Sequence, residues 1–297
     1  MILVTGATGF IGSHLVRRLV EQGERPRCLV RDVERARSLL PGTELVQGDT
    51  TRPETLPEAV QGVDTIVHCA FVTADRKQTA ATRYYATNVE GTDNLIKAAK
   101  EAGVRRMIEL SGLGTKPDKP GSYMQGRYLA EQALTTSGLD WTIVRPSVVF
   151  GKGAPFISGL VNLIRTSPVL PLLGGGKIMF QPIFVEDVVS VVLFLLEHPE
   201  QTSGRIYTIG GPEYYSFEQI LDLLTRTMGK KRLKVPAPLP FVALGAAVLE
   251  AVLPKPPLTR EAVSLFTFDN TTALDSVERD FFFIPVSFRA YLQEQGV

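Results

Sequence analysis

Three glycines near the amino terminus, Gly6, Gly9 and Gly12, follow one another at intervals of three residues in the segment TGATGFIG. An apolar run over residues 2–5 precedes them, and a segment with apolar residues at helical spacing follows. Glycine permits a tight turn and lets backbone N–H groups approach a pyrophosphate, whose charge then lies at the positive end of the helix. The pattern therefore predicts a dinucleotide-binding loop, with a tight turn that binds nothing as the alternative. The loop residues expected to contact the dinucleotide are Gly6, Thr8, Gly9, Phe10, Ile11 and Gly12.

The segment VRDVERAR follows this loop at the distance, about twenty residues, where a dinucleotide-binding unit recognises the ribose. An acidic residue at the end of the second strand hydrogen-bonds a ribose 2′-hydroxyl, whereas an arginine accepts a 2′-phosphate. Arg31 comes first after the predicted strand and Arg35 follows one helical turn later, so guanidinium groups are available for a 2′-phosphate. This arrangement favours NADP. Two alternatives are that Asp32 selects NAD and that the arginines form only a solvated helix face.

The first half of the chain alternates runs rich in β-branched residues with longer helical patterns, which is typical of βαβ units around a parallel sheet. The predicted strands cover residues 2–5, 27–30, 44–47, 65–69, 107–110 and 141–144. The predicted helices cover residues 11–22, 33–40, 53–61, 82–102 and 122–137. Glycine follows four of these helices, as expected for a left-handed helix end. The elements predict an α/β fold with a Rossmann-type, doubly wound parallel sheet.

The alternation stops after Phe150. The segments KGAPFISG and SPVLPLLGGGK are rich in Gly and Pro and predict loops over the carboxyl edge of the sheet, where open α/β sheets bind ligands. Helices are predicted over residues 186–197 and 216–228, the second opened by a Ser216 to Gln219 capping box, with a strand over 205–209 between them. We therefore expect an NAD(P)-binding Rossmann domain over residues 1–150 and a smaller substrate-binding α/β lobe over residues 151–297, interleaved with the sheet edge.

Composition and charge exclude several classes of protein. The chain carries 32 basic and 31 acidic side chains, so no basic surface for nucleic acid is expected. Cys28 and Cys69 lie in apolar runs and are interpreted as buried thiols; with the scattered histidines they provide no metal-ligand spacing. The start MILVTGATG lacks the basic region of a signal peptide, which predicts a cytoplasmic protein. The apolar stretches 188–196 and 240–253 are too short for a transmembrane helix.

Further segments occur in a fixed order along the chain: QGDTTRPE, VHCAF, NVEGTDNLIKAA, IVRPSVVFG, QPIFVEDVVSVV and TIGGPEYYSFEQI. Together with the glycine loop they resemble the extended and atypical short-chain dehydrogenase/reductase superfamily, which includes NAD-dependent epimerases and dehydratases. SGLDWTIVRPSVVFG and PLTREAVSLFTFDN more closely resemble the branch related to the NAD(P)-binding accessory subunit of respiratory complex I. The resemblance covers most of the chain and implies a doubly wound fold that binds NAD(P).

The resemblance also implies further cofactor contacts. In the family, the residue matching Asp49 hydrogen-bonds the adenine amino group, and those matching Ala70 and Phe71 lie beside the adenine ribose and pyrophosphate. Core packing is the alternative for Phe71. Asn88 matches a structural helix residue. The loop after the sixth strand, expected beside the nicotinamide carboxamide, includes Pro146, Val148 and Val149.

Tyr123 and Arg127 match the family's catalytic pair, in which a tyrosine is the general acid/base and a lysine stands four residues later. That spacing puts both side chains one turn apart on a helix face, so that the cation stabilises the deprotonated tyrosine and holds the nicotinamide ribose. Arg127 keeps the charge and the reach of lysine, but its planar fork cannot release a proton and does not suit a proton relay. The alternative for Tyr123 is a partly exposed helix tyrosine without a catalytic role.

The third catalytic position departs from the family pattern. The fifth strand ends in LSGLGT, and Gly112 occupies the place of the usual catalytic hydroxyl residue. Ser111 or Thr115 could polarise the substrate oxygen after a small loop shift; equally, Ser111 only caps the strand end. Because the loss of one well-placed donor costs roughly a hundred- to a thousandfold in rate, weak or altered catalysis is expected.

The expected substrate region contains mostly apolar residues and few of the arginines that hold a nucleotide-sugar diphosphate, which favours an apolar or amphiphilic small molecule. These apolar residues are Phe156, Leu160, Leu163, Ile164, Leu170, Leu172, Leu173, Ile178, Met179 and Phe180. The leading hypothesis is an NAD(P)(H)-dependent oxidoreductase that acts on a hydroxyl or carbonyl group. The alternatives are a non-catalytic NADPH-binding assembly or redox-sensing protein and a sugar-nucleotide epimerase or dehydratase.

Residues 235–257 form an apolar segment that predicts a helix able to lie on a membrane or on a protein partner, with packing on its own domain as the alternative. This segment has too few Lys and Arg residues to favour a membrane strongly. Family members often dimerise through the helices that correspond to residues 82–102 and 122–137, so a homodimer is a further expectation.

Overall fold

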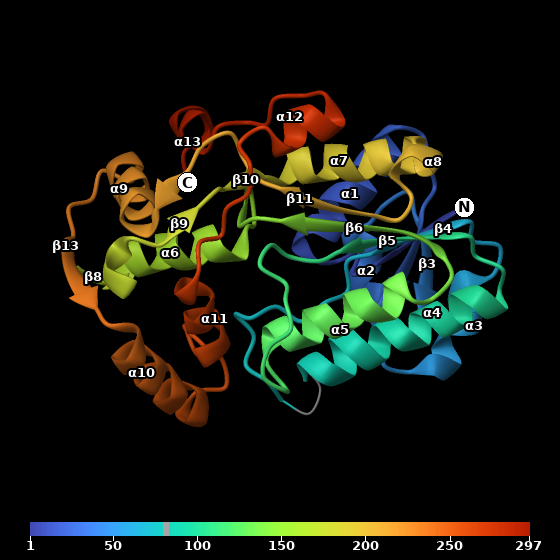
Figure 1. Ribbon diagram of the computed structural model, residues 1–297, viewed down its shortest axis with the longest axis horizontal. Coiled ribbons are helices and arrows are strands. Elements are labelled where there is room, and N and C mark those ends of the chain that lie inside the picture. The colour runs from blue at the N-terminus through green and yellow to red at the C-terminus, as the bar shows by residue number, and fades with distance from the viewer. Residues whose placement is uncertain (80–82) are drawn as a thin grey trace. The chain divides into compact units, whose positions relative to one another are not determined.

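The computed structural model describes residues 1–79 and 83–297 (Figure 1). The described chain divides into two compact units. The first, which we call the sheet unit, comprises Met1–Thr73, Gln78–Arg145 and Val188–Tyr207. The second, the C-terminal unit, comprises Ala74–Lys77, Pro146–Asp187 and Thr208–Val297.

A seven-stranded sheet with the order β11-β6-β5-β4-β1-β2-β3 is the centre of the sheet unit. All pairs from β6 to β3 are parallel, and the chain order reverses between β1 and β4. The predicted doubly wound α/β fold is confirmed. Ligands of such sheets bind beyond the carboxyl ends of the strands at this reversal. The strands are β1 (Ile2–Thr5), β2 (Arg27–Val30), β3 (Glu44–Gln47), β4 (Thr65–His68), β5 (Arg106–Leu110), β6 (Asp140–Pro146) and β11 (Arg205–Ile209).

Helices cover both faces of this sheet; Figure 1 shows α4 and α5 on one face and α8 on the other. The core beneath α3, α4 and α5 contains the buried residues Leu56, Leu95 and Leu134 against Ile66 and Met107 of the strands. Their spacing buries one apolar face of each helix against the sheet. The helices are α1 (Phe10–Glu21), α2 (Val33–Leu39), η1 (Pro53–Thr55), α3 (Leu56–Val60), the π-helix η2 (Tyr85–Glu90), α4 (Gly91–Glu101), α5 (Tyr123–Thr135), α7 (Val185–Glu197) and α8 (Pro199–Thr202).

The sequence-based elements of the sheet unit are confirmed with small changes of boundary. Strands 2–5, 27–30 and 44–47 have the predicted bounds, and the glycines after four predicted helices, Gly23, Gly62, Gly103 and Gly138, all have a left-handed φ. The helix predicted over 82–102 is a π-helix followed by α4, and its first residue lies outside the described residues. The Ser216 capping box is also present, at the start of α9 (Phe217–Thr227).

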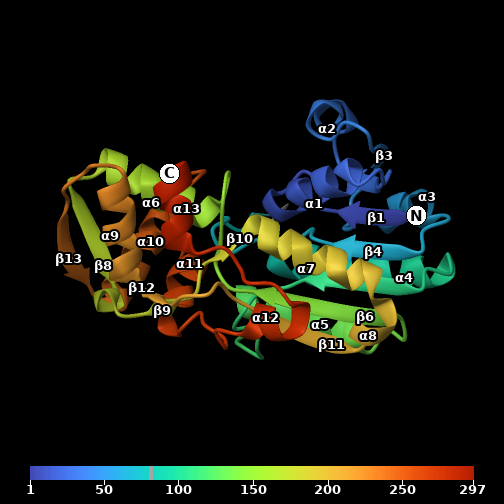
Figure 2. The same cartoon turned by 90° about the horizontal axis from the view of Figure 1, so that it is seen from above.

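The C-terminal unit consists of short paired strands and helices, which Figure 2 shows from above. β8 and β13 pair in parallel, β7 with β10 in parallel, and β9 with β12 antiparallel. Its strands are β7 (Val149–Phe150), β8 (Val169–Leu173), β9 (Met179–Phe180), β10 (Ile183–Phe184), β12 (Tyr215–Ser216) and β13 (Leu233–Ala237). Its helices are α6 (Pro155–Thr166), η3 (Gly174–Gly176), α9 (Phe217–Thr227), α10 (Leu239–Val252), α11 (Arg260–Ser264), η4 (Leu265–Thr267), α12 (Ser276–Phe281) and α13 (Phe288–Gln295).

The prediction of loops in KGAPFISG and SPVLPLLGGGK was wrong, because these segments contribute to α6 and β8. Pro155 occupies the first turn of α6, where a missing backbone N–H costs nothing. Ile157, Leu160 and Ile164 then recur at helical spacing and are buried. The stability of β8 comes from pairing with β13, which lies far away in the sequence and which local composition does not show.

The helix predicted over residues 235–257 was too long. Residues 235–237 belong to β13, and α10 ends at Val252. Prolines at both ends explain these limits, since proline suits the first turn of a helix and cannot continue its interior. No helix in the described part of the chain is long and apolar enough to cross a membrane.

Candidate active site

The glycine loop after β1 approaches the neighbouring backbone too closely for any side chain. A Cβ atom on Gly6 would lie 2.6 Å from the carbonyl carbon of Cys69, and Gly6 has a φ of +68°. A Cβ atom on Gly12 would lie 2.3 Å from the carbonyl oxygen of Gly6, and Gly9 N donates to the same oxygen at 2.8 Å. The predicted need for glycine at these positions therefore has a geometric cause.

The first turn of α1 leaves its backbone N–H groups available to a ligand. Gly9 is the N-cap in extended conformation, and no side chain of the described residues caps the helix. The first turn contains no acidic residue. A helix start of this kind attracts an anion through its N–H groups and its dipole. The residues present, Thr8, Gly9, Phe10, Ile11 and Gly12, thus fit the pyrophosphate of a dinucleotide.

Some of the side chains after β2 already make hydrogen bonds or ion pairs within the protein. Asp32 is the N-cap of α2, and its Oδ1 accepts a hydrogen bond from Arg35 N at 3.0 Å. The side chains of Arg31 and Arg35 are exposed. Arg37 lies two residues further along and pairs with Glu34 at 3.4 Å. The capping of α2 gives Asp32 a structural role that needs no contact with a ribose. The two exposed guanidinium groups of Arg31 and Arg35 are available for a phosphate.

Asp49 shapes the turn after β3 with one of its two carboxylate oxygens. Its Oδ1 accepts hydrogen bonds from the backbone N and the hydroxyl of Thr51, each at 2.9 Å. Thr55 Oγ1 in turn receives the Asp49 N–H at 3.0 Å. This turn fixes the carboxylate at the carboxyl end of the sheet and leaves Oδ2 for a donor such as an amino group.

The segment after β4 is held from α4 and the π-helix. The amide of Asn88 accepts from Val72 N at 2.8 Å and donates to Val72 O at 3.1 Å, which fixes the chain next to Ala70 and Phe71. His68 is fully buried, with Nδ1 2.6 Å from Thr5 Oγ1 and Nε2 3.1 Å from the Thr92 hydroxyl. Burial and, to a smaller degree, the positive charge of Arg127 lower the pKa of His68 to about 3. This histidine is therefore neutral and structural.

Tyr123 and Arg127 contact each other on the inner face of α5. Arg127 Nε donates to Tyr123 Oη at 3.1 Å, and Arg127 Nη1 donates to the carbonyl oxygen of Leu110 at 2.7 Å. The guanidinium carbon also lies 4.3 Å from the ring centroid of Phe71. Arg127 is 6% exposed and Tyr123 9%. In this hydrogen bond the guanidinium can only donate, so the phenolic proton stays on Tyr123.

The two candidate hydroxyl groups after β5 donate their protons within the protein. Ser111 Oγ donates to Glu131 Oε1 at 2.5 Å, and Thr115 Oγ1 donates to the carbonyl oxygen of Gly112 at 2.7 Å. Within 4 Å, a Cβ atom on Gly112 would meet only Tyr123 Oη among the described residues, at 3.8 Å. The position of the usual catalytic hydroxyl is thus open, and it faces the phenol.

The loop after β6 is described within the C-terminal unit. Val148 N donates to Asn270 Oδ1 at 2.9 Å, and Ser147 Oγ donates to the same side chain at 2.8 Å. Pro146 ends β6, and Val149 begins β7. Phe150 is 1% exposed and packs against Phe184, Phe288 and Tyr291.

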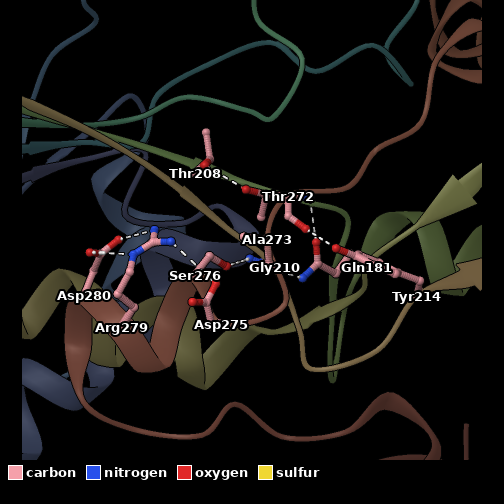
Figure 3. Close-up of polar contacts among 10 residues, drawn as sticks. All are labelled: Gln181, Thr208, Gly210, Tyr214, Thr272, Ala273, Asp275, Ser276, Arg279 and Asp280. Carbon is pink, nitrogen blue, oxygen red and sulfur yellow. Dashed lines mark hydrogen bonds and ion pairs between the residues drawn. The ribbon is translucent and has the colours of Figure 1, made fainter.

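The motif segments of the C-terminal unit form a structural clamp around Gln181 (Figure 3). The Gln181 amide donates to Gly211 O at 2.7 Å and accepts from Thr272 N at 2.7 Å. Tyr214 Oη and Thr208 Oγ1 also bond to Thr272. A Cβ atom on Gly210 would lie 2.3 Å from Gln181 Cδ, so glycine is required beside this amide.

Most apolar residues expected around a substrate are core residues of the C-terminal unit instead. Six of the ten are buried: Leu160, Ile164, Leu170, Leu172, Leu173 and Phe180. Phe180 packs against Phe156, Phe217 and Phe266. No group of three or more metal-ligating side chains occurs in the described part of the chain.

A family model described as NAD dependent epimerase/dehydratase matches residues 2–210, which is most of the chain. The chain belongs to this family. Its glycine loop and the Tyr123 helix lie within the matched residues, as does the whole parallel sheet. The predicted membership of the extended short-chain dehydrogenase/reductase superfamily is thereby confirmed.

Relatives of the chain differ in what they are named for. It is 25% identical to "NADH dehydrogenase [ubiquinone] 1 alpha subcomplex subunit 9, mitochondrial" of Arabidopsis thaliana, over 91% of this chain and 68% of that protein. It is 28% identical to a "Ceramide reductase" of Caulobacter vibrioides, over 84% of this chain and 78% of that protein. A solved structure, the dTDP-glucose 4,6-dehydratase DesIV of Streptomyces venezuelae with NAD and TYD bound, has a TM-score of 0.73 and 24% identity. It covers 99% of this chain and 97% of its own, and it shares the NAD(P)-binding fold.

A cluster of buried ionisable side chains lies beneath α5, the helix that carries Tyr123, and the sequence patterns did not predict it. Glu131, four residues after Arg127 on α5, binds Arg145 Nε at 2.9 Å and also contacts Arg145 Nη2. Glu109 of β5 is fully buried, and neither of its carboxylate oxygens has a hydrogen-bond partner among the described residues. Burial and the nearby charge of Glu131 raise the pKa of Glu109 to about 8. The helical spacing of residues 123, 127 and 131 was the available signal for Glu131.

Proposed function

We propose that this protein is an NADP(H)-dependent oxidoreductase that interconverts a hydroxyl and a carbonyl group on a small, apolar or amphiphilic molecule. The hydrogen bond from Arg127 Nε to Tyr123 Oη carries the proposal. It fixes the position of the phenolic oxygen beside a guanidinium that cannot accept a proton from it. When bound, the nicotinamide supplies or accepts the hydride.

Tyr123 supplies the proton at its phenolic oxygen when a carbonyl is reduced, and takes one up when a hydroxyl is oxidised. Arg127 cannot relay that proton, since guanidinium stays charged. It instead holds the phenol in place through the hydrogen bond from Nε to Tyr123 Oη. The bond to the Leu110 carbonyl and the Phe71 ring hold the guanidinium in this place.

The site lacks a free hydroxyl at the third catalytic position. Ser111 and Thr115 donate to Glu131 and Gly112, so neither presents a proton to a substrate oxygen in this arrangement. Loss of such a donor costs about a hundred- to a thousandfold in rate. Slow turnover is therefore part of the proposal, with Tyr123 as the single proton donor to the substrate.

The preference for NADP rests on the residues after β2. Asp32 Oδ1 is used to cap α2, which weakens its claim on a ribose hydroxyl. Arg31 and Arg35 are exposed next to it and offer two guanidinium groups to a 2′-phosphate. The preference for an apolar or amphiphilic substrate is supported by the relative named as a ceramide reductase.

A panel of aldehydes, ketones and quinones with NADPH tests the proposal, with the decrease of NADPH absorbance as the readout. The wild-type protein should turn over at least one carbonyl compound, and Tyr123→Phe should abolish turnover without loss of NADPH binding. The matched control is Tyr128→Phe, the same change five residues further along α5. A Tyr123→Phe variant as active as wild type would remove this tyrosine from the mechanism.

The second candidate is a protein that holds NADPH without turning it over and serves assembly or redox sensing. Two observations favour it. The hydroxyls of Ser111 and Thr115 donate hydrogen bonds within the protein, and the chain is similar to a subunit of NADH dehydrogenase of Arabidopsis thaliana. It predicts that NADPH raises the melting temperature by mass action while no substrate oxidises it. Steady turnover with any carbonyl compound decides against this candidate.

A further inference from the structure

The outer face of α10 is apolar and exposed. Phe241, Leu244, Val248 and Val252 follow one another at intervals of three or four residues, and their side chains are 74%, 66%, 56% and 72% exposed. This spacing places them on one face of the helix. We call these four residues the apolar stripe. A stripe on an ordinary surface helix faces the core, whereas this one faces away from it.

The inner face of α10 holds the one charged residue of the helix. Glu250 is 16% exposed and binds Arg260 Nε at 2.9 Å, and its other oxygen accepts from Arg260 N at 2.9 Å. Ala246, on the same side, is buried. α10 lies against α11, as Figures 1 and 2 both show. The helix thus uses its polar contact to attach to its own unit and presents apolar side chains outward.

The strand pair that leads into α10 has a similar exposed face. Leu233 and Val235 of β13 are 64% and 41% exposed, and Val169, the partner of Leu233 on β8, is 38% exposed. Lys234 points to the opposite face, where it binds Glu218 and Asp222 of α9. Exposed apolar residues therefore occur on two successive elements.

The segment from Lys230 to Arg260 is basic, whereas the charge of the whole chain is nearly balanced. Residues 230–260 contain one acidic residue, Glu250, whereas the whole chain has nearly equal numbers of acids and bases. Lys230, Lys231 and Lys255 at the two ends of the β13–α10 segment are exposed. The cations of the segment are Lys230, Lys231, Arg232, Lys234, Lys255 and Arg260.

We propose that α10 lies flat on an anionic lipid bilayer, with the apolar stripe among the headgroups and upper acyl carbons and the flanking lysines on the lipid phosphates. The helix has 14 residues and is about 21 Å long, which suits attachment to a surface rather than a crossing. Exposed apolar side chains and nearby cations are the two features that interfacial helices combine. The proposal does not depend on the oxidoreductase function.

A second copy of the chain is the competing occupant of the stripe. A two-fold contact would bring the same basic segment of both copies to one interface, since the same patch serves both subunits. Like charges oppose that association, while an anionic surface gains from the same charges. The charge of residues 230–260 therefore favours lipid over a second copy.

Co-sedimentation of the full-length protein with vesicles tests the proposal. The vesicles contain phosphatidylcholine alone or phosphatidylcholine with phosphatidylglycerol. Wild-type protein should sediment with the anionic vesicles, at least about tenfold more than with neutral ones, and less at high salt. A double variant with Leu244→Glu and Val248→Glu should lose this binding at least about tenfold. The matched control is Leu274→Glu, an equally drastic change at a 47% exposed leucine outside the segment.

Because all three substituted positions are exposed, we expect the variants to keep the wild-type melting temperature. An unchanged melting temperature shows that they remain folded. Failure of the wild type to bind anionic vesicles, or equal binding by the double variant, would overturn the proposal. So would a wild-type dimer at micromolar concentration that the double variant converts to monomer, because a second copy would then cover the stripe. Strong binding to anionic vesicles with a monomer in solution supports it.

Discussion

Arg127 donates a hydrogen bond through Nε to the phenolic oxygen of Tyr123, one helical turn earlier on α5, at 3.1 Å. The same guanidinium is fixed by the Leu110 carbonyl and by the ring of Phe71. Arg127, in place of the family's lysine, therefore keeps a positive charge at the phenol. Its guanidinium is fixed by the hydrogen bond to the last residue of β5. The consequence is a phenol with a rigidly held positive charge beside it.

Tyr123→Phe removes the proposed proton donor and keeps the ring. We expect kcat for carbonyl reduction to fall by about a hundredfold or more, because general acid catalysis contributes about 10²–10⁴ in rate. NADPH affinity should stay within about twofold, because the phenol contacts the substrate. Steady-state kinetics and a binding titration measure both, with Tyr128→Phe as the control that leaves both unchanged.

Gly112→Ser adds a hydroxyl at a position where a Cβ atom would lie 3.8 Å from Tyr123 Oη. We expect the new side chain to fit without loss of stability and to donate to the substrate oxygen. Turnover should rise by about tenfold or more, a part of the hundred- to thousandfold that one such donor supplies. Gly112→Ala is the control that adds the Cβ without the hydroxyl; if it is as active as Gly112→Ser, the hydroxyl has no role.

Glu109→Gln tests the buried carboxyl of β5. The pKa of Glu109 in the folded protein is about 8, well above the value of about 4.3 for an unfolded chain. Between these values the folded protein binds a proton that the unfolded chain does not, so the free energy of unfolding falls as pH rises through this range. Glutamine does not titrate, so the free energy of unfolding of Glu109→Gln should not fall in this way as pH rises.

The melting temperature of Glu109→Gln should therefore match wild type near pH 5 and exceed it by several degrees near pH 8.5. Thermal unfolding at a series of pH values measures the difference. A constant difference between the two proteins at all pH values would show that Glu109 does not titrate in this range. Glu34→Gln, a change at an exposed glutamate of α2, provides the matched control.

A double variant with Arg31→Ala and Arg35→Ala tests coenzyme selection. We expect NADPH affinity to fall by about tenfold or more, because charge-assisted bonds to a phosphate are the strong ones. NADH affinity should stay unchanged, since that coenzyme lacks the 2′-phosphate. Arg37→Ala is the control, because this arginine already pairs with Glu34. Equal losses for both coenzymes would point to a general charge effect instead.

The sheet unit could be predicted almost entirely from the sequence. Its strands are short apolar runs, and its helices end at glycines, so local pattern and tertiary structure agree. The segment around α6 and β8 could not be predicted, because glycine and proline there mask a buried helix face and a strand that depends on distant β13. Long-range pairing of this kind leaves no local pattern.

The candidate site could be predicted in its residues but only partly in its arrangement. The resemblance to the family indicated the pair Tyr123 and Arg127, and the spacing of the glycines indicated the glycine loop. Neither could show that Ser111 donates to Glu131, or that Asp32 caps α2, because these hydrogen bonds depend on where the turns place each side chain. Glu109 was missed because an acidic residue within an apolar strand has no local pattern that reveals its burial.

We expect the loop between β1 and α1 to bind a nicotinamide dinucleotide, and titration calorimetry of the purified protein with NADPH and NADH measures this binding. Wild-type protein should bind at least one of them. Gly12→Ala should weaken that binding by about a hundredfold or more, because its Cβ would lie 2.3 Å from Gly6 O. Gly159→Ala, at an open position of α6, is the control and should bind as wild type does. Folded wild-type protein that binds neither coenzyme would contradict the account, whatever the variants do.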